Sequence, residues 1–192
     1  YGTILFAFAL LLYFNTIPNR YAIDDNIVVL NPVVEKGIKA IPEIFSTRYQ
    51  ITEKYNYGYR PLGKASFAIE HSLFGKNPHI SHLINILLYG FTAFVLFITL
   101  RLLLANYGAP FIFTITAIFI AHPIHTEAVA SLKNREELLC LLGGVGCLYF
   151  FTRAILERRY SFFLYGLLAF LAAVLSKQNA AVFFLIIPLT LY

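Results

Sequence analysis

The sequence has 192 residues, of which 59% are hydrophobic and only 13% are charged. A soluble domain carries about 25% charged residues, so the composition excludes a soluble protein with an ordinary polar surface. The net charge of +5 comes from basic residues dispersed among apolar blocks, and the absence of a basic stripe excludes a nucleic-acid-binding surface. The apolar blocks approach the roughly 20 residues that a helix needs to cross a bilayer. The sequence therefore predicts an all-α polytopic membrane protein.

Six apolar segments are expected to be membrane-spanning helices. They cover residues 2–17, 80–104, 109–124, 137–154, 160–176 and 179–192. The first segment starts without a Met and the last stops inside an apolar run, so we expect the natural protein to extend in both directions. Residues 1–192 are then one partial transmembrane module.

Residues 18–79 form a long polar insertion between the first and second predicted spans. Arg101, Arg153, Arg158 and Arg159 mark cytoplasmic loops by the positive-inside rule, which places 18–79, 122–136 and 176–178 together on the periplasmic or lumenal face. Two stretches of the insertion, near 33–46 and 62–74, are amphipathic. They are expected to lie as helices in the membrane interface, above a cavity that could hold a lipid with a polar head.

An acidic pair, Asp24 and Asp25, follows the first span directly. Transfer of a sugar from a lipid phosphate to a hydroxyl needs a base, and a carboxylate at the membrane surface suits that task. Adjacent side chains diverge in any regular backbone, so at most one of the pair can be the base, and the other could orient the acceptor or a positive partner. The alternative is a helix N-cap followed by a solvated acidic loop.

Basic residues in the outer segments are candidates for contact with a lipid phosphate, because cations stabilise a departing phosphate. The candidates are Arg60, Lys64, Arg135 and Lys177. The alternative for Arg60 and Lys177 is a side chain that extends toward lipid headgroups from a helix end. Arg135 could equally belong to a loop rich in helix caps.

Histidine, amide and acidic residues near the span ends are candidates for lining a cavity: His82, Asn85, His122, His125 and Glu127. Polar groups at this depth usually face protein or a wet cavity, so hydrogen bonds between helices are an equal alternative for His82 and Asn85. The order of His122, His125 and Glu127 is not HExxH, and a second ligand cluster is missing. We therefore expect no metal site.

The order of these motifs along the chain resembles that of the type C glycosyltransferases. The similarity is greatest to the transmembrane and tetratricopeptide-repeat-containing O-mannosyltransferase family and its bacterial relatives, and it covers essentially all 192 residues. Its most specific phrases are Gly58-Tyr59-Arg60-Pro61-Leu62, His82-Leu-Ile-Asn85 and His122-Pro-Ile-His-Thr-Glu-Ala-Val129. Relatives usually have Lys-Glu where this chain has Lys177-Gln178, and Gly-Arg where it has Asn134-Arg135.

The resemblance implies an inverting transferase in the bacterial inner membrane or the endoplasmic reticulum, with its active site on the periplasmic or lumenal face. The implied donor is a polyprenyl- or dolichyl-phosphate sugar, the acceptor is a protein or envelope-glycan hydroxyl, and no further cofactor is expected. By motif position, the catalytic acidic pair corresponds to Asp24 and Asp25, with Asp24 favoured as the base. Later spans and any repeat domain would lie outside these 192 residues.

A non-catalytic membrane subunit that keeps this fold and binds a partner complex or lipid is the alternative function. A transporter is disfavoured, because no charge relay or pair of glycine-broken helices occurs in corresponding halves. Gly143, Gly144 and Gly146 are instead expected to allow close contact between helices.

Overall fold

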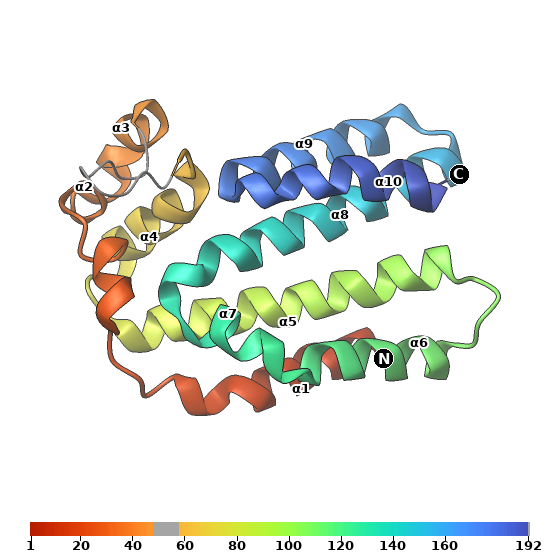
Figure 1. Cartoon of the computed structure of the whole chain (residues 1–192), viewed down its shortest axis with the longest axis horizontal. Helices are drawn as coiled ribbons and strands as arrows, with labels where there is room; N and C mark the ends of the chain where they lie inside the picture. The colour runs from red at the N-terminus through yellow and green to blue at the C-terminus, as the bar shows by residue number, and fades with distance from the viewer. Residues whose placement is uncertain (48–57, 192) are drawn as a thin grey trace.

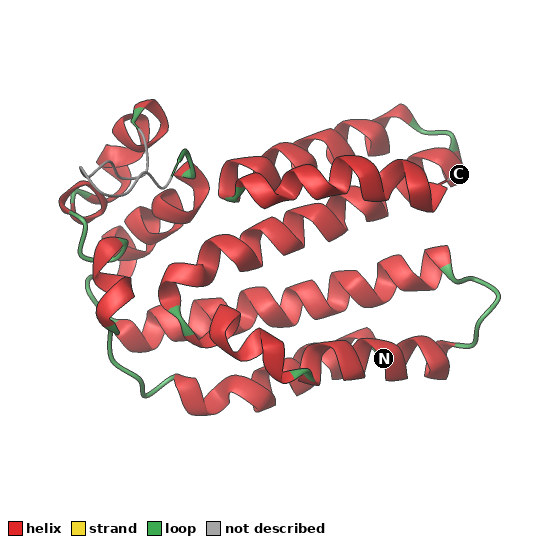
Figure 2. Cartoon of the chain, viewed as in Figure 1, coloured by secondary structure: helices red, strands yellow, loops and turns green. Residues whose placement is uncertain are grey.

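The chain is helical throughout the part that the computed structural model describes, residues 1–47 and 58–191 (Figure 2). Helices and short loops account for these ranges, and they contain no strand. The predicted all-α class is confirmed.

The strongly apolar helices run side by side in a bundle (Figure 1). They are α1 (Gly2–Tyr13), α5 (Pro78–Leu103), α6 (Ala109–Ala121), α8 (Arg135–Glu157), α9 (Tyr160–Ser176) and α10 (Phe183–Leu191).

The start of α5 shows how the sequence determines where a helix begins. The Asn77 side chain accepts hydrogen bonds from the backbone N–H groups of His79 (3.1 Å) and Ile80 (3.4 Å), and Pro78 occupies the first helical position, where no N–H is needed.

Within the described residues, two helical segments are long and apolar enough to cross a membrane, residues 78–103 and 132–157. A third span results if α6 and the segment 123–130 are counted together, although they are bent by 50° at their junction. The apolar helices at 2–16, 160–176 and 178–191 are shorter than this length. The predicted number of six spans is therefore not confirmed, while the predicted apolar segments are helical.

The core of the bundle lies between α1, α5 and α6. Leu5 and Ala9 of α1 are fully buried against this core, as is Ile112 of α6. Tyr13 packs edge-on against Tyr89 of α5, with 5.4 Å between the ring centroids, an arrangement that aromatic pairs prefer.

The polar insertion folds into short helices at one end of the bundle (Figure 1). These are α2 (Pro32–Glu35), the 3-10 turn η3 (Gly37–Ala40), α3 (Ile41–Ser46) and the longer α4 (Pro61–Phe74). Each amphipathic stretch has apolar side chains on two faces. Val34, Ile44 and Phe67 are buried in a second core, which Leu132 of the α6–α8 connection also joins. Other apolar side chains of the two stretches are exposed: Ile38, Phe45, Ile69, Leu73 and Phe74.

The segments that connect the long helices gather at opposite ends of the bundle. The insertion, the connection from α6 to α8 and the connection from α9 to α10 lie at one end, and residues 104–108 and 158–159 lie at the other (Figure 1). The predicted outer segments are thus brought together in space. The side of the membrane that they face stays a prediction.

Candidate active site

The two carboxylates of the acidic pair have different surroundings. Both lie in the 3-10 turn η2 (Ile23–Ile27). Asp25 is buried, and its carboxylate accepts hydrogen bonds from the backbone N–H groups of Ala22 (2.8 Å) and Lys133 (2.9 Å). The second bond joins this turn to η5 (Leu132–Asn134), 108 residues away in the sequence. Asp25 therefore fixes the position of the turn.

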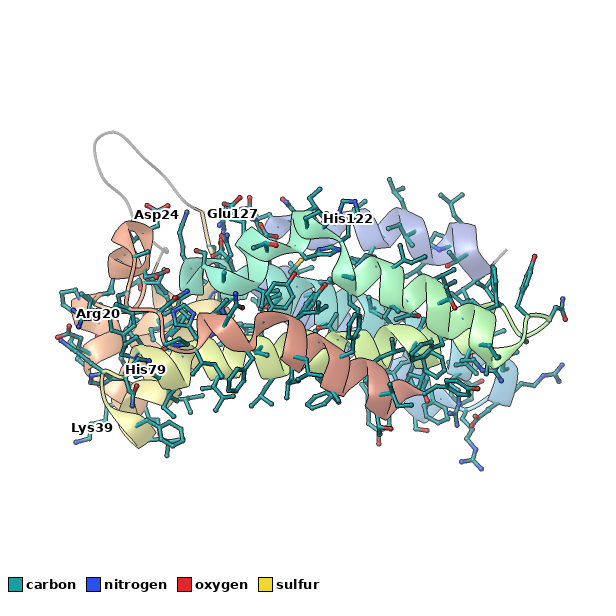
Figure 3. All side chains as sticks on the ribbon, turned by 90° about the horizontal axis from the view of Figure 1, so that it is seen from below. Arg20, Asp24, Lys39, His79, His122 and Glu127 are labelled. Atoms are coloured by element: carbon teal, nitrogen blue, oxygen red, sulfur yellow. The ribbon has the colours of Figure 1, made fainter. Side chains whose placement is uncertain are left out.

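Asp24 is exposed, in contrast to its neighbour. It lies along the same edge of the molecule as Glu127 and His122 (Figure 3). The sequence predicted that only one member of the pair could act as a base. The structure leaves Asp24 accessible and uses Asp25 as a tether.

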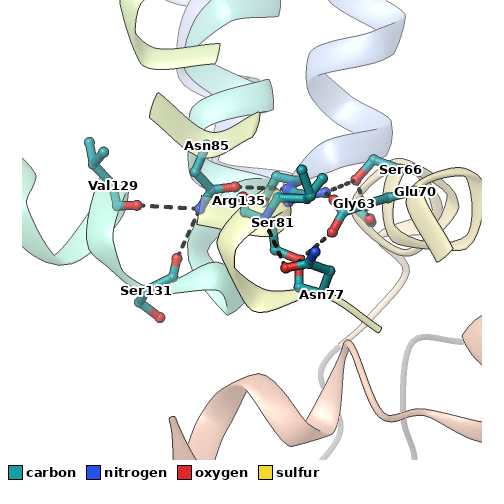
Figure 4. Close-up of polar contacts among 10 residues, drawn as sticks. Gly63, Ser66, Glu70, Asn77, Ser81, Asn85, Val129, Ser131 and Arg135 are labelled. Carbon is teal, nitrogen blue, oxygen red and sulfur yellow. Dashed lines mark hydrogen bonds and ion pairs between the residues drawn. The ribbon is translucent and has the colours of Figure 1, made fainter. Parts of the chain in front are cut away.

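Arg135, at the first position of α8, is completely buried. Its guanidinium donates to Asn85 Oδ1 (2.8 Å), to Glu70 Oε2 (2.7 Å) and to the Ser81 carbonyl (3.0 Å). These partners lie on α4 and α5, so one side chain joins three helices (Figure 4). The guanidinium carbon also lies 3.7 Å from the centroid of the Phe67 ring.

This position of Arg135 does not fit the expected contact with a lipid phosphate, because the side chain has no exposed surface and its donors are already used by protein groups. Asn85 belongs to the same network. Its amide group also donates to the carbonyls of Val129 and Ser131, both at 3.3 Å. For Asn85 the structure thus shows the alternative reading, a hydrogen bond between helices, and not a cavity-lining position.

Arg60 and Lys177 are each held by a glutamate at the start of α8. Arg60, at the N-cap of α4, forms an ion pair with Glu136, and Lys177, just after α9, forms an ion pair with Glu137. Arg60 and Lys177 are 18% and 16% exposed, so both cations are partly accessible. The structure brings these two predicted phosphate ligands to the same helix end.

A close approach between Gly58 and Gln178 brings the same two segments together. Gly58 has φ +75°, a backbone conformation that favours glycine, and a Cβ placed on it would lie 3.0 Å from Gln178 Nε2. The phrase that begins at Gly58 therefore contacts the Lys177-Gln178 turn directly.

Lys64 is buried in α4, and desolvation by burial lowers the pKa of its ammonium. A buried position differs from the exposed one expected for a phosphate ligand. His82 is buried as well, close to the backbone of Arg20.

A cavity of about 400 Å³ lies beside the start of α8. Two of the predicted cavity-lining residues, His125 and Glu127, do line it, whereas His82, Asn85 and His122 are not among its lining residues. His122 is exposed, and its Nδ1 accepts a hydrogen bond from the Ile124 N–H at 3.2 Å. Residues 1–47 and 58–191 contain no group of three His, Cys, Asp or Glu side chains that could hold a metal ion.

The sequence motifs assign no site role to several residues that shape the site: Glu70, Asn134, Glu136 and Glu137. The run Arg135-Glu136-Glu137 is a visible signal, because three charged residues begin an otherwise apolar helix. Their partners are 40 to 76 residues away, so the sequence alone could not pair them.

The chain is similar in sequence to several known proteins, which are named as protein O-mannosyl-transferases. The Drosophila melanogaster protein O-mannosyl-transferase Tmtc1 is 28% identical over 178 residues, 91% of this chain. Human protein O-mannosyl-transferase TMTC1 is 35% identical over 60% of the chain, and human TMTC2 is 31% identical over 78% of it. The chain is TMTC-like in sequence.

The similarity covers only a small part of each relative's length. The chain spans 20% of the length of the fly relative and 14% and 17% of the two human relatives. No family model matches the chain, and no solved structure matches it.

Proposed function

We propose that residues 1–192 carry part of the active site of a membrane glycosyltransferase that takes its sugar from a polyprenyl or dolichyl phosphate. The observation that supports this most directly is the convergence at one end of the bundle. The exposed Asp24 is tethered through Asp25 to the 132–134 turn, and Arg60 and Lys177 are both bound to the first turn of the helix that follows.

The chemistry is a single displacement at the anomeric carbon. The acceptor oxygen forms a bond to this carbon while the bond from the carbon to the phosphate oxygen breaks, which inverts the configuration. Asp24 takes the proton of the acceptor hydroxyl. The electron pair of the broken bond leaves with the polyprenyl phosphate.

Arg60 and Lys177 interact with the phosphate group. The donor is a phosphodiester with one negative charge, and the leaving phosphate gains a second charge as the bond breaks. The attraction of the two cations for the phosphate therefore increases toward the transition state, which is the condition for catalysis as distinct from binding. Glu136 and Glu137 hold the two cations in place before the donor binds.

The proposed active site faces the periplasm or the lumen, and the acceptor is a hydroxyl of a protein or an envelope glycan. The names of the relatives, protein O-mannosyl-transferases, support a mannosyl donor and a protein acceptor. Membrane lipid surrounds the apolar helices.

The test compares variants of the full-length protein in transfer from a synthetic polyprenyl-phosphate mannose. Asp24→Asn is expected to lower turnover by about 10²–10⁴-fold with unchanged donor binding, since the carboxylate acts only in the transition state. Arg60→Ala is expected to weaken donor binding and to lower turnover as well.

The control is Glu43→Gln, which removes an exposed carboxylate of the same insertion that pairs with Lys36. This variant should keep wild-type turnover. Full activity in a folded Asp24→Asn protein would exclude Asp24 as the base. A wild-type protein that binds the donor but transfers no sugar to any hydroxyl acceptor would favour the non-catalytic subunit.

A further inference from the structure

The cavity beside the start of α8 has a lining that is both polar and apolar. Part of the lining comes from the 3-10 turn η4 (Pro123–His125) and the short helix α7 (Thr126–Ala130), and another part comes from Asn134 and the first turns of α8. Tyr89 of α5 also lines it. The polar lining residues are His125, Glu127, Asn134 and Glu137.

These groups are suited to binding the hydroxyl groups of a sugar. The carboxylates of Glu127 and Glu137 accept hydrogen bonds from hydroxyls, and the Asn134 amide both donates and accepts. The apolar lining, which includes Ala128 and Leu138, offers surface for the C–H faces of a pyranose ring. A volume of about 400 Å³ lies in the range of small-ligand pockets, which combine an apolar wall with a few placed polar groups.

The charge of the cavity limits what it can hold. Two carboxylates contribute to the lining, those of Glu127 and Glu137, and Glu137 is paired with Lys177. An anionic group inside the cavity would meet like charges, which disfavours it. A neutral hexosyl group fits this environment, whereas a uronosyl group or the phosphate itself does not.

The cavity is connected through its lining residues to the proposed phosphate ligand Lys177 and to the turn that carries the acidic pair. Glu137 is shared between the cavity and the ion pair with Lys177, so a phosphate at Lys177 would lie at the rim. Asn134 follows Lys133, whose backbone N–H binds Asp25 next to the exposed Asp24. An anomeric carbon at the mouth of the cavity would thus lie between the ion pair that holds Lys177 and the turn that positions Asp24.

We propose that this cavity is the subsite for a neutral hexosyl group of the donor, an inference that rests on the proposed function. Glu127 is its specificity-determining residue: its carboxylate accepts hydrogen bonds from the sugar hydroxyls and excludes an acidic sugar. The polyprenyl phosphate part of the donor lies outside the cavity, on Arg60 and Lys177.

The experiment separates the sugar from the lipid phosphate. In the full-length protein, the Michaelis constant for polyprenyl-phosphate mannose is compared with the inhibition constant of polyprenyl phosphate, which lacks the sugar. Glu127→Gln keeps the shape of the side chain and removes its charge. It should raise the Michaelis constant about tenfold or more, the scale of a hydrogen bond to a charged group, and leave the inhibition constant unchanged.

Two further variants test separately the binding of the sugar and the binding of the lipid phosphate. Ala128→Leu fills the cavity from a neighbouring position, so it should also raise the Michaelis constant and leave the inhibition constant unchanged. Arg60→Ala should raise both constants. Glu127→Gln should also reduce the preference of the protein for a mannosyl over a uronosyl donor. Each variant is first checked for a wild-type thermal unfolding midpoint.

The outcomes are distinguishable. If the wild type transfers mannose and both Glu127→Gln and Ala128→Leu leave the two constants unchanged, or raise both equally, the subsite lies elsewhere while the proposed function stands. If the wild type neither transfers mannose nor binds polyprenyl phosphate, the proposed function fails, and this inference fails with it.

Discussion

Arg135 is a charged residue in a position with no exposure, and its surroundings explain how the fold tolerates it. Glu70 supplies the opposite charge, and Asn85 and Ser81 accept further hydrogen bonds from the guanidinium. The planar fork of arginine can reach all three at once, which the point charge of a lysine cannot. The network therefore requires arginine and not only a positive charge.

Replacing Arg135 by Met should destabilise the protein by about 3–5 kcal/mol, because Glu70 is left as a buried charge without its partner. Adding Glu70→Leu should recover part of the loss, since the unpaired charge is then removed. The measurement is thermal or denaturant unfolding in detergent. The exposed pair Lys36–Glu43 provides the control, because Lys36→Met should cost less than about 1 kcal/mol. Equal losses in Arg135→Met and Lys36→Met would contradict the structural role.

At the scale of single residues, the sequence predicts chemical type better than position. The divergence of Asp24 and Asp25 follows from backbone geometry, but the member that is buried is decided by the N–H of Lys133, far along the chain. In the same way, Arg135 and Arg60 are both basic residues at a helix start. Only their tertiary partners distinguish the buried network from the partly exposed ion pair.

Close packing between α8 and α9 depends on a glycine. A Cβ on Gly143 would lie 2.9 Å from the Ala169 carbonyl oxygen and from Ala173, both on α9. A Cβ on Gly146 would lie 3.9 Å from Ala169, an ordinary contact distance. The two glycines are three residues apart on one helix and differ in how much room they have.

Gly143→Ala should therefore destabilise the protein by about 1–3 kcal/mol, because the backbone of α9 must move away. Gly146→Ala should instead be neutral or stabilise by up to about 1 kcal/mol, the difference in helix propensity between the two residues. Unfolding midpoints in detergent compare the two variants directly. A Gly143→Ala protein as stable as Gly146→Ala would show that the helices are not held by this contact.

At the scale of helices, the sequence predicted most elements and several of their ends. The expected segment 62–74 corresponds to α4 at Pro61–Phe74, and 160–176 corresponds to α9. The segment 109–124 differs, because α6 ends at Ala121, before Pro123, and the chain bends by 50° into the next helical segment. Pro123 marks the break in the sequence, but the direction of the bend depends on packing against α5 and α8.

The whole molecule has two chemically different ends. The insertion and the α6–α8 connection hold the proposed site at one end, and the loop with Arg158 and Arg159 lies at the other (Figure 1). A positively charged loop favours the cytoplasmic side of a membrane. The two ends should therefore face opposite sides.

Cysteine labelling of the full-length protein in sealed vesicles of known orientation tests this arrangement. Lys39→Cys and Thr126→Cys are exposed positions of the site end, and Arg159→Cys is exposed at the other end. An impermeant maleimide should label the first two from the lumenal or periplasmic side and the third only from the cytoplasmic side. Labelling of Thr126→Cys and Arg159→Cys from the same side would contradict the topology.

The three consecutive charged residues that begin α8 make this region sensitive to insertions and deletions. Successive positions on a helix point about 100° apart, at 3.6 residues per turn, so Arg135, Glu136 and Glu137 reach Glu70, Arg60 and Lys177 in three directions. A residue inserted or deleted between Lys133 and Arg135 would displace the Lys133 N–H relative to this helix start, so the bond to Asp25 and the three ion pairs could not all be kept. Homologous sequences should therefore vary freely in the length of the insertion while keeping the spacing from the Asp25 tether point to this helix start unchanged.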